Sequence, residues 1–253
     1  MTKKILYLFI LVLIPTQVFS MHIMEGYLPV KWSLVWSLAF VPVFLYGIKN
    51  IQKLIIQTPE KRMILAMVVA FAFVLSSLKL PSVTGSSSHA TGMGFGTALV
   101  GPASMSIVGT IVLLFQVFLL AHGGLTTLGA NAFAMAFVGP IMTYVIYKVC
   151  QRGGLSLRTA LFSAAVLGNL ATYVTTSAQL AFAHPDPVSG ISGAFIKFIS
   201  IFGITQIPVA IVEGLITVMV INVLISNDFI KESTLFSYGY NRFKTKELAH
   251  GTK

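Results

Sequence analysis

Two histidines in this chain have the type and position needed to bind a transition-metal ion. His22 directly follows Met21, and residues 1–20 have the features of a removable signal peptide, so cleavage would give Met21 a free amine. That amine, the backbone amide nitrogen of His22 and its imidazole Nδ1 would close two fused chelate rings. His89 lies in a loop rich in glycine and serine and is expected to supply a fourth nitrogen.

The donor set predicts which ions such a site would prefer. Four nitrogen atoms in a plane suit Ni(II), Cu(II) or low-spin Co(II) better than Zn(II), which favours a tetrahedron. Because the amide of His22 must lose its proton, we expect binding to weaken in acid. The alternative is that His22 and His89 face solvent separately and never meet.

The segment expected to be removed has the usual three parts of a secretory signal. Residues 1–20 begin with the positive charges of Lys3 and Lys4, continue through an apolar run from Ile5 to Ile14, and end at the small residue Ser20. The apolar run is too short to span a bilayer. The alternative is a retained, slightly polar anchor helix.

The composition of the chain predicts the elements that position these groups. Of 253 residues, 56% are hydrophobic and 9% are charged, whereas a soluble domain carries about 25% charged residues. This excludes disorder, and a single cysteine excludes a disulfide scaffold. The composition predicts a polytopic membrane protein, in which the net charge of +10 indicates cytoplasmic loops before nucleic acid.

Apolar stretches predict an all-α membrane protein with about seven transmembrane helices. A short glycine-rich segment, 90–101, is expected to form one broken crossing. The membrane domain is expected to cover residues 21–226, and residues 227–253 to form a cytoplasmic tail. Six longer stretches can each cross the bilayer: 32–48, 63–80, 104–121, 127–149, 159–183 and 201–226.

The distribution of basic residues favours seven crossings and sets the orientation. With the mature amino terminus outside and segment 90–101 crossing, twelve basic residues lie on the cytoplasmic side. Only Lys31, Lys79 and Lys197 then lie outside, as do His22 and His89. If the segment does not cross, a loop with three basic residues falls on the wrong side.

Other polar residues are expected to be structural, with alternatives. His122, in a Gly-Gly turn at the end of a span, is interpreted as an interfacial histidine, and His184 either gathers cations or ends a helix. Asn131 either hydrogen-bonds a ligand histidine or joins helices. Glu25 is expected to orient the amino terminus, to offset its charge, or only to keep this end of the chain hydrated. Glu213 is the only acid deep in a span, and we expect it to have a hydrogen-bonded packing role.

Three motifs resemble the CbiM family, the cobalt-binding membrane subunits of energy-coupling-factor importers, which are close relatives of the nickel-binding NikM subunits. The resemblance covers essentially the whole mature chain, and the motifs occur in the family's order. One departure is Ala90, where proline would be expected. The motifs are MHIMEGYLP at 21–29, LPSVTGSSSHATG at 80–92 and LAHGGLTTLGAN at 120–131.

The resemblance implies a site and a set of partners. Its metal ligands would be the Met21 amine, the amide and imidazole of His22, and the imidazole of His89. The subunit would not be an enzyme and would need no catalytic cofactor. It would capture Co(II) for cobalamin synthesis at the outer side of a bacterial cytoplasmic (inner) membrane. Its partners would be a transmembrane coupling subunit, ATPase subunits and a small accessory membrane subunit, with membrane lipid around it and no nucleic acid.

Three other functions remain open. A nickel-specific importer subunit would use the same nitrogen donors. A self-contained secondary transporter for divalent metals usually shows paired ionisable residues at mid-membrane, and Glu213 alone gives it weak support. An intramembrane metalloenzyme lacks its H-E-x-x-H motif here. The sequence also contains no G-x-x-x-x-G-K-[ST] loop, so ATP-driven import would need a separate ATPase.

Overall fold

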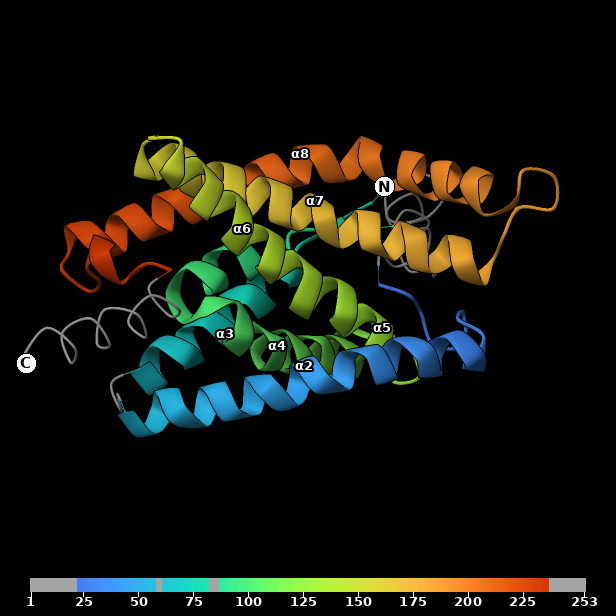
Figure 1. Cartoon of the computed structure of the whole chain (residues 1–253), viewed down its shortest axis with the longest axis horizontal. Coiled ribbons are helices and arrows are strands. Elements are labelled where there is room, and N and C mark those ends of the chain that lie inside the picture. Colours follow the sequence, from blue (N-terminus) through green and yellow to red (C-terminus); the bar gives the residue numbers. More distant parts are fainter. Residues whose placement is uncertain (1–21, 58–60, 82–86, 237–253) are drawn as a thin grey trace, which may run out of the picture.

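Helices make up most of this computed structural model (Figure 1), which describes residues 22–57, 61–81 and 87–236. The expected signal peptide, Met21 and the tail beyond residue 236 lie outside the described residues. The long helices are α2 (Val30–Gln57), α3 (Lys61–Ser77), α4 (Met93–Leu120), α6 (Gly139–Arg152), α7 (Leu157–Ala183) and α8 (Gly190–Ser226). Short α5 (Leu128–Ala132) and the π-helical η2 (Phe133–Val138) run into α6, and the 3₁₀ turn η3 (Glu232–Thr234) follows α8.

Five helices are long and apolar enough to cross a membrane. They are Val30–Ile56, Met93–Leu120, Leu128–Arg152, Leu157–Ala183 and Gly190–Ser226. The six long stretches expected from the sequence are helical over most of their length, but α3 has only 17 residues and ends at Ser77, so that the end of the stretch expected at 63–80 lies in strand β1 (Lys79–Pro81) instead. The protein is therefore a multi-pass membrane protein of largely helical structure, and the count of seven crossings stays a prediction.

Helix α4 is interrupted where the sequence predicted a short, broken segment. Gly101 has φ 79° and ψ 161°, outside the helical region, and Pro102 follows it. Glycine adopts positive φ without a Cβ clash, and proline has no N–H to continue the helical hydrogen bonds. Residues 93–100 therefore form the first part of α4, and a kink at Gly101 separates them from the rest of the helix.

The helices pack around α4, while their outer faces remain apolar. Helices α7 and α8 run side by side, and α2 lies along the opposite side of the bundle (Figure 1). Large apolar side chains such as Leu38 on α2 and Leu215 on α8 are exposed. In water such faces would be a liability, but in a bilayer they contact lipid chains.

Two short strands hold the segment that carries His89. Strand β1 (Lys79–Pro81) pairs antiparallel with β2 (Ser87–His89), so that Lys79 lies opposite His89. Residues 82–86 of the connecting loop lie outside the described residues. The sequence did not predict this pairing, which places His89 at the start of the turn into α4.

Candidate metal centre

Three histidines from distant parts of the chain meet in one buried cluster. The ring centroids of His22 and His89 are 4.8 Å apart, those of His22 and His122 are 4.9 Å apart, and those of His89 and His122 are 5.1 Å apart. One ligand atom from each ring lies within 4.8 Å of the others. Their exposed fractions are 5%, 0% and 2%, respectively. This three-histidine cluster could hold a metal ion.

The ring of His89 is oriented by its own backbone neighbour. Its Nδ1 lies 2.8 Å from the carbonyl oxygen of Ala90. A carbonyl can only accept, so Nδ1–H is the donor and Nε2 carries the free lone pair. Nε2 is buried and has no hydrogen-bond partner in the described part of the chain. An imidazole held in this tautomer is ready to donate Nε2 to a metal ion.

The segment that carries His22 is held in place by the residues around α5. The N–H of Ile23 donates to Oδ1 of Asn131 at 2.9 Å, and Nδ2 of Asn131 donates back to the carbonyl of Ile23 at 3.0 Å. The hydroxyl of Thr127 donates to the same carbonyl at 2.6 Å. Asn131 thus satisfies both backbone groups of Ile23, which fixes the residue next to His22.

A second attachment of the same segment involves the Gly-Gly turn that follows His122. Both the N–H and the hydroxyl of Thr126 donate to the carboxylate of Glu25. These hydrogen bonds lower the pKa of Glu25. A Cβ at Gly124 would lie 2.6 Å from the backbone of Glu25, so only glycine permits this approach. The turn therefore brings His122 and His22 together.

Burial keeps the three imidazoles neutral. Removal from water lowers the pKa of His89 to about 4 and lowers the pKa of His22 and His122 well below the ordinary value. A proton on one ring would also be repelled by a proton on a neighbouring ring and by the charge of Lys79, which acts in the same direction on His22 and His122. At neutral pH the rings therefore present lone pairs, which is the form that metal ions bind.

The structure brings some of the residues expected from the sequence together and separates others. The alternative in which His22 and His89 face solvent and never meet is wrong. Met21 lies outside the described residues, so its role as a ligand stays a prediction. His184 lies apart from the cluster: its Nε2–H donates to the carbonyl of Tyr27 at 2.9 Å, where it ends α7. Asn131 bonds both backbone groups of Ile23, the residue next to His22.

The sequence reasoning missed His122. We interpreted this residue as a structural histidine at a span end, and the structure does place it there, after α4. Its ring nevertheless contacts both of the other imidazoles. The available signal was the third histidine-containing motif, His122-Gly123-Gly124, whose glycines permit close approach to the amino-terminal segment.

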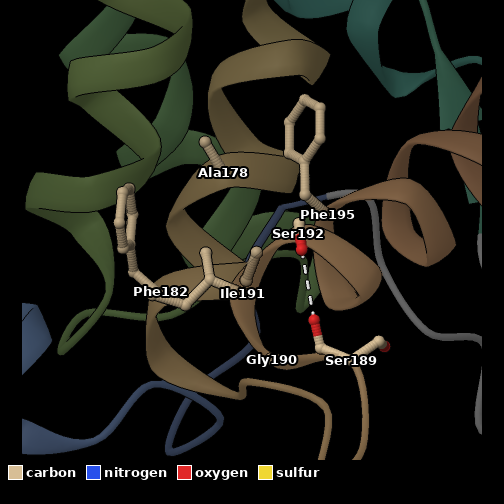
Figure 2. Close-up of a pocket in the computed structure, with 8 residues that line it drawn as sticks. Ala178, Phe182, Ser189, Gly190, Ile191, Ser192 and Phe195 are labelled. Atoms are coloured by element: carbon tan, nitrogen blue, oxygen red, sulfur yellow. Dashed lines mark hydrogen bonds between the residues drawn. The ribbon is translucent and has the colours of Figure 1, made fainter.

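A separate pocket lies between the end of α7 and the start of α8 (Figure 2). The hydroxyl of Ser192 donates to the carbonyl of Ser189 at 3.1 Å within it. The lining contains no imidazole, thiol or carboxylate, and it shares no residue with the three-histidine cluster. The residues that line it are Ala178, Ala181, Phe182, Ser189, Gly190, Ile191, Ser192 and Phe195.

Fold and site together define a class: multi-pass helical membrane proteins with a buried imidazole cluster. Two solved structures share the fold. One, described as a transition metal transporter, aligns with a TM-score of 0.73 at 28% identity over 86% of this chain and 98% of its own. The other, described as a truncated transition metal transporter, aligns with a TM-score of 0.72 at 28% identity, covering 81% of this chain and 99% of its own.

Sequence comparison identifies the family. Residues 22–228 match the family model CbiM, described as a cobalt uptake substrate-specific transmembrane region. The cobalt transport protein CbiM of Anoxybacillus flavithermus is 58% identical over 86% of this chain and 87% of its own length. The protein of the same name from Salmonella typhimurium is 51% identical over 83% of this chain and 86% of its own. The chain belongs to the CbiM family. Membership in this transport family confirms the resemblance and favours transport over the intramembrane metalloenzyme.

Proposed function

We propose that this protein is the substrate-capture subunit of an ATP-driven cobalt importer. Co(II) is the transported substrate, bound by the Met21 amine, by the amide nitrogen and Nδ1 of His22, and by Nε2 of His89. The observation that carries this proposal is the buried contact between His22 and His89, with Nε2 of His89 unpartnered among the described residues. Two solvent-facing histidines would not be packed ring against ring.

The fixed position of Ile23 supports the terminal chelate. Because Asn131 and Thr127 hold both backbone groups of Ile23, the peptide that precedes it has little freedom. This attachment keeps the ring of His22 in contact with the ring of His89. Fused chelate rings need this kind of preorganisation, since every freely rotating bond would cost binding entropy. His122 packs edge-on against both rings and closes the site from water.

The proposed topology follows from charge. Residues 1–20 act as a signal peptide whose removal exposes the Met21 amine, and the mature terminus lies outside the cytoplasmic membrane. The chain crosses seven times, with the interrupted start of α4 as the short crossing, and the tail from residue 227 lies in the cytoplasm. Basic residues of the cytoplasmic side, such as Arg152 and Lys231, are available there for partner subunits or anionic lipid.

The proposed partners are a transmembrane coupling subunit, ATPase subunits and a small accessory membrane subunit. The supporting observation is that the sequence contains no phosphate-binding G-x-x-x-x-G-K-[ST] loop. Uptake of Co(II) into proteoliposomes tests this directly. We expect ATP-dependent uptake when the chain is reconstituted with its ATPase and coupling subunits, and none from the chain alone. Equal uptake by the chain alone, driven by an ion gradient, would establish the secondary transporter instead.

A nickel-specific importer is the second candidate, because the donor chemistry suits nickel equally well. Four nitrogens in a plane suit Ni(II) as well as low-spin Co(II). Uptake of each ion alone by the same reconstituted complex decides between them. Under the cobalt proposal, Co(II) should accumulate in the vesicles with ATP and Ni(II) should not.

A further inference from the structure

Glu213 is a fully buried acid in α8 that the proposed chelate does not use. Its carboxylate accepts from the N–H of Thr91 at 2.6 Å and from the hydroxyl of Thr91 at 3.0 Å. It also accepts from Nδ2 of Asn169, on α7, at 2.5 Å. All of these partners are donors, so the arrangement matches an acceptor-only carboxylate. The structure confirms the hydrogen-bonded role expected from the sequence, and it adds that one of the partners is Thr91, in the segment that carries His89.

Thr91 connects this carboxylate to the loop that carries His89. It stands two residues after His89, and its hydroxyl accepts from the N–H of Met93 at 3.2 Å, at the first residue of α4. The carboxylate of Glu213 therefore lies beside the amino-terminal end of α4, where exposed N–H groups carry partial positive charge. This location stabilises a buried negative charge and fixes the position of the turn.

The carbonyl of His89 is held by the same two helices. The hydroxyl of Tyr173, on α7, donates to it at 3.0 Å, and Nε2 of Gln206, on α8, donates at 3.2 Å. Gln206 also donates to Oδ1 of Asn169 at 2.6 Å. The backbone on both sides of Ala90 is thus tied into one hydrogen-bonded network. The Glu213 network consists of Thr91, Asn169, Tyr173, Gln206 and Glu213.

We propose that Glu213 is a positioning residue for the metal ligand His89. It sets the backbone of the loop, and through it the direction of Nε2, without contacting the ion. This proposal rests on the proposed function, because it concerns the same cobalt site. Replacing Glu213 by glutamine would remove the charge that strengthens these hydrogen bonds and would leave one acceptor oxygen where the carboxylate has two, so the network would be weakened in a buried place.

The first test is Co(II) binding by the processed full-length chain in detergent, measured by isothermal titration. We expect Glu213→Gln to weaken binding roughly 10- to 100-fold, the usual effect of removing support behind a ligand. Thr217→Val is the matched control, because Thr217 is also buried on α8, four residues further on, and its hydroxyl bonds nothing in the described structure. Binding by Glu213→Gln as tight as that of the control would overturn the proposal.

The second test separates positioning from general destabilisation. If Glu213 acts through His89, then Glu213→Gln should cost little further affinity in a His89→Ala background. A full additional loss in that background would show that the effect does not pass through His89. If Glu213→Gln cannot be purified folded, Thr91→Val takes its place. Thr91→Ser, which keeps the hydroxyl, should then bind like the unmodified chain, and a failure of this rescue would count against the proposal.

Hydrogen exchange in metal-free protein keeps this test independent of the proposed function. Glu213→Gln should speed exchange of peptides covering residues 87–93, whereas Thr217→Val should not. If the unmodified chain binds no Co(II), the proposed function fails, and the exchange result still judges the network. Unchanged exchange in Glu213→Gln would overturn the positioning role even if cobalt binding by the unmodified chain is tight.

Discussion

Asn131 shows how a single side chain places the beginning of the chain. It gives Ile23 one donor and one acceptor, as a neighbouring strand would. The sequence predicted that His22 and His89 come together, and the structure shows their rings in contact; their role as metal ligands stays a prediction. The contact of Asn131 could not be predicted, since it joins positions 108 residues apart. The sequence did not predict that His122 belongs to the cluster, because a histidine in a Gly-Gly turn at the end of a span is already accounted for by a structural role at the membrane interface.

We predict that Asn131→Ala weakens Co(II) binding tenfold or more. The substitution leaves the buried N–H of Ile23 without its partner, at a cost of about 1–3 kcal/mol, and about 1.4 kcal/mol corresponds to a factor of ten in affinity. Isothermal titration measures the change. Asn227→Ala, at the exposed end of α8, is the control and should bind normally. Equal affinities of the two variants would show that Asn131 does not hold the ligand segment.

At the scale of elements, hydrophobicity predicted the long helices, and the glycine content predicted the break at the start of α4. The sequence could not predict the β1–β2 pair, because strands of three residues leave no periodic pattern. It also could not show that the turn after α4 lies against the amino-terminal segment. That contact depends on Gly124, where the backbone of Glu25 leaves no room for a Cβ.

We predict that Gly124→Ala displaces the amino-terminal segment and strongly reduces Co(II) affinity while the helices remain folded. The new Cβ would lie 2.6 Å from the backbone of Glu25, which cannot move without breaking its bonds to Thr126. Gly203→Ala is the matched control, because a Cβ there meets nothing within 4 Å. Circular dichroism reports helix content and titration reports binding. Undiminished affinity in Gly124→Ala would contradict the role assigned to this turn.

The whole molecule exposes apolar side chains on its outer faces and buries a network of polar side chains, whereas a soluble protein keeps most of its apolar side chains inside. The charge distribution predicts the orientation in the membrane, which the helices alone do not. Helix α7 has 27 residues and at 1.5 Å per residue is about 40 Å long, enough to separate its two ends across a bilayer. The turns at Arg152 and Val188 flank this helix and should lie on opposite sides.

Cysteine labelling in intact cells tests this orientation. In a Cys150→Ser background, which removes the single native cysteine, we expect Val188→Cys to react with a membrane-impermeant maleimide added outside. Arg152→Cys should react only after the membrane is opened. Both positions are exposed on the protein surface. Labelling of both from outside, or of Arg152→Cys alone, would contradict the proposed topology.

The central claim is that the processed amino terminus chelates the transported ion together with His89. Isothermal titration with Co(II) of the processed chain, and of the same chain with residues 1–20 retained, tests it most directly. The uncleaved chain keeps every histidine but turns the Met21 amine into a peptide amide without a basic lone pair, so we predict that tight binding is abolished. His89→Ala should weaken binding severely with some residual affinity, because it removes one donor of four. If the uncleaved chain binds Co(II) as tightly as the processed chain, the terminal chelate is wrong.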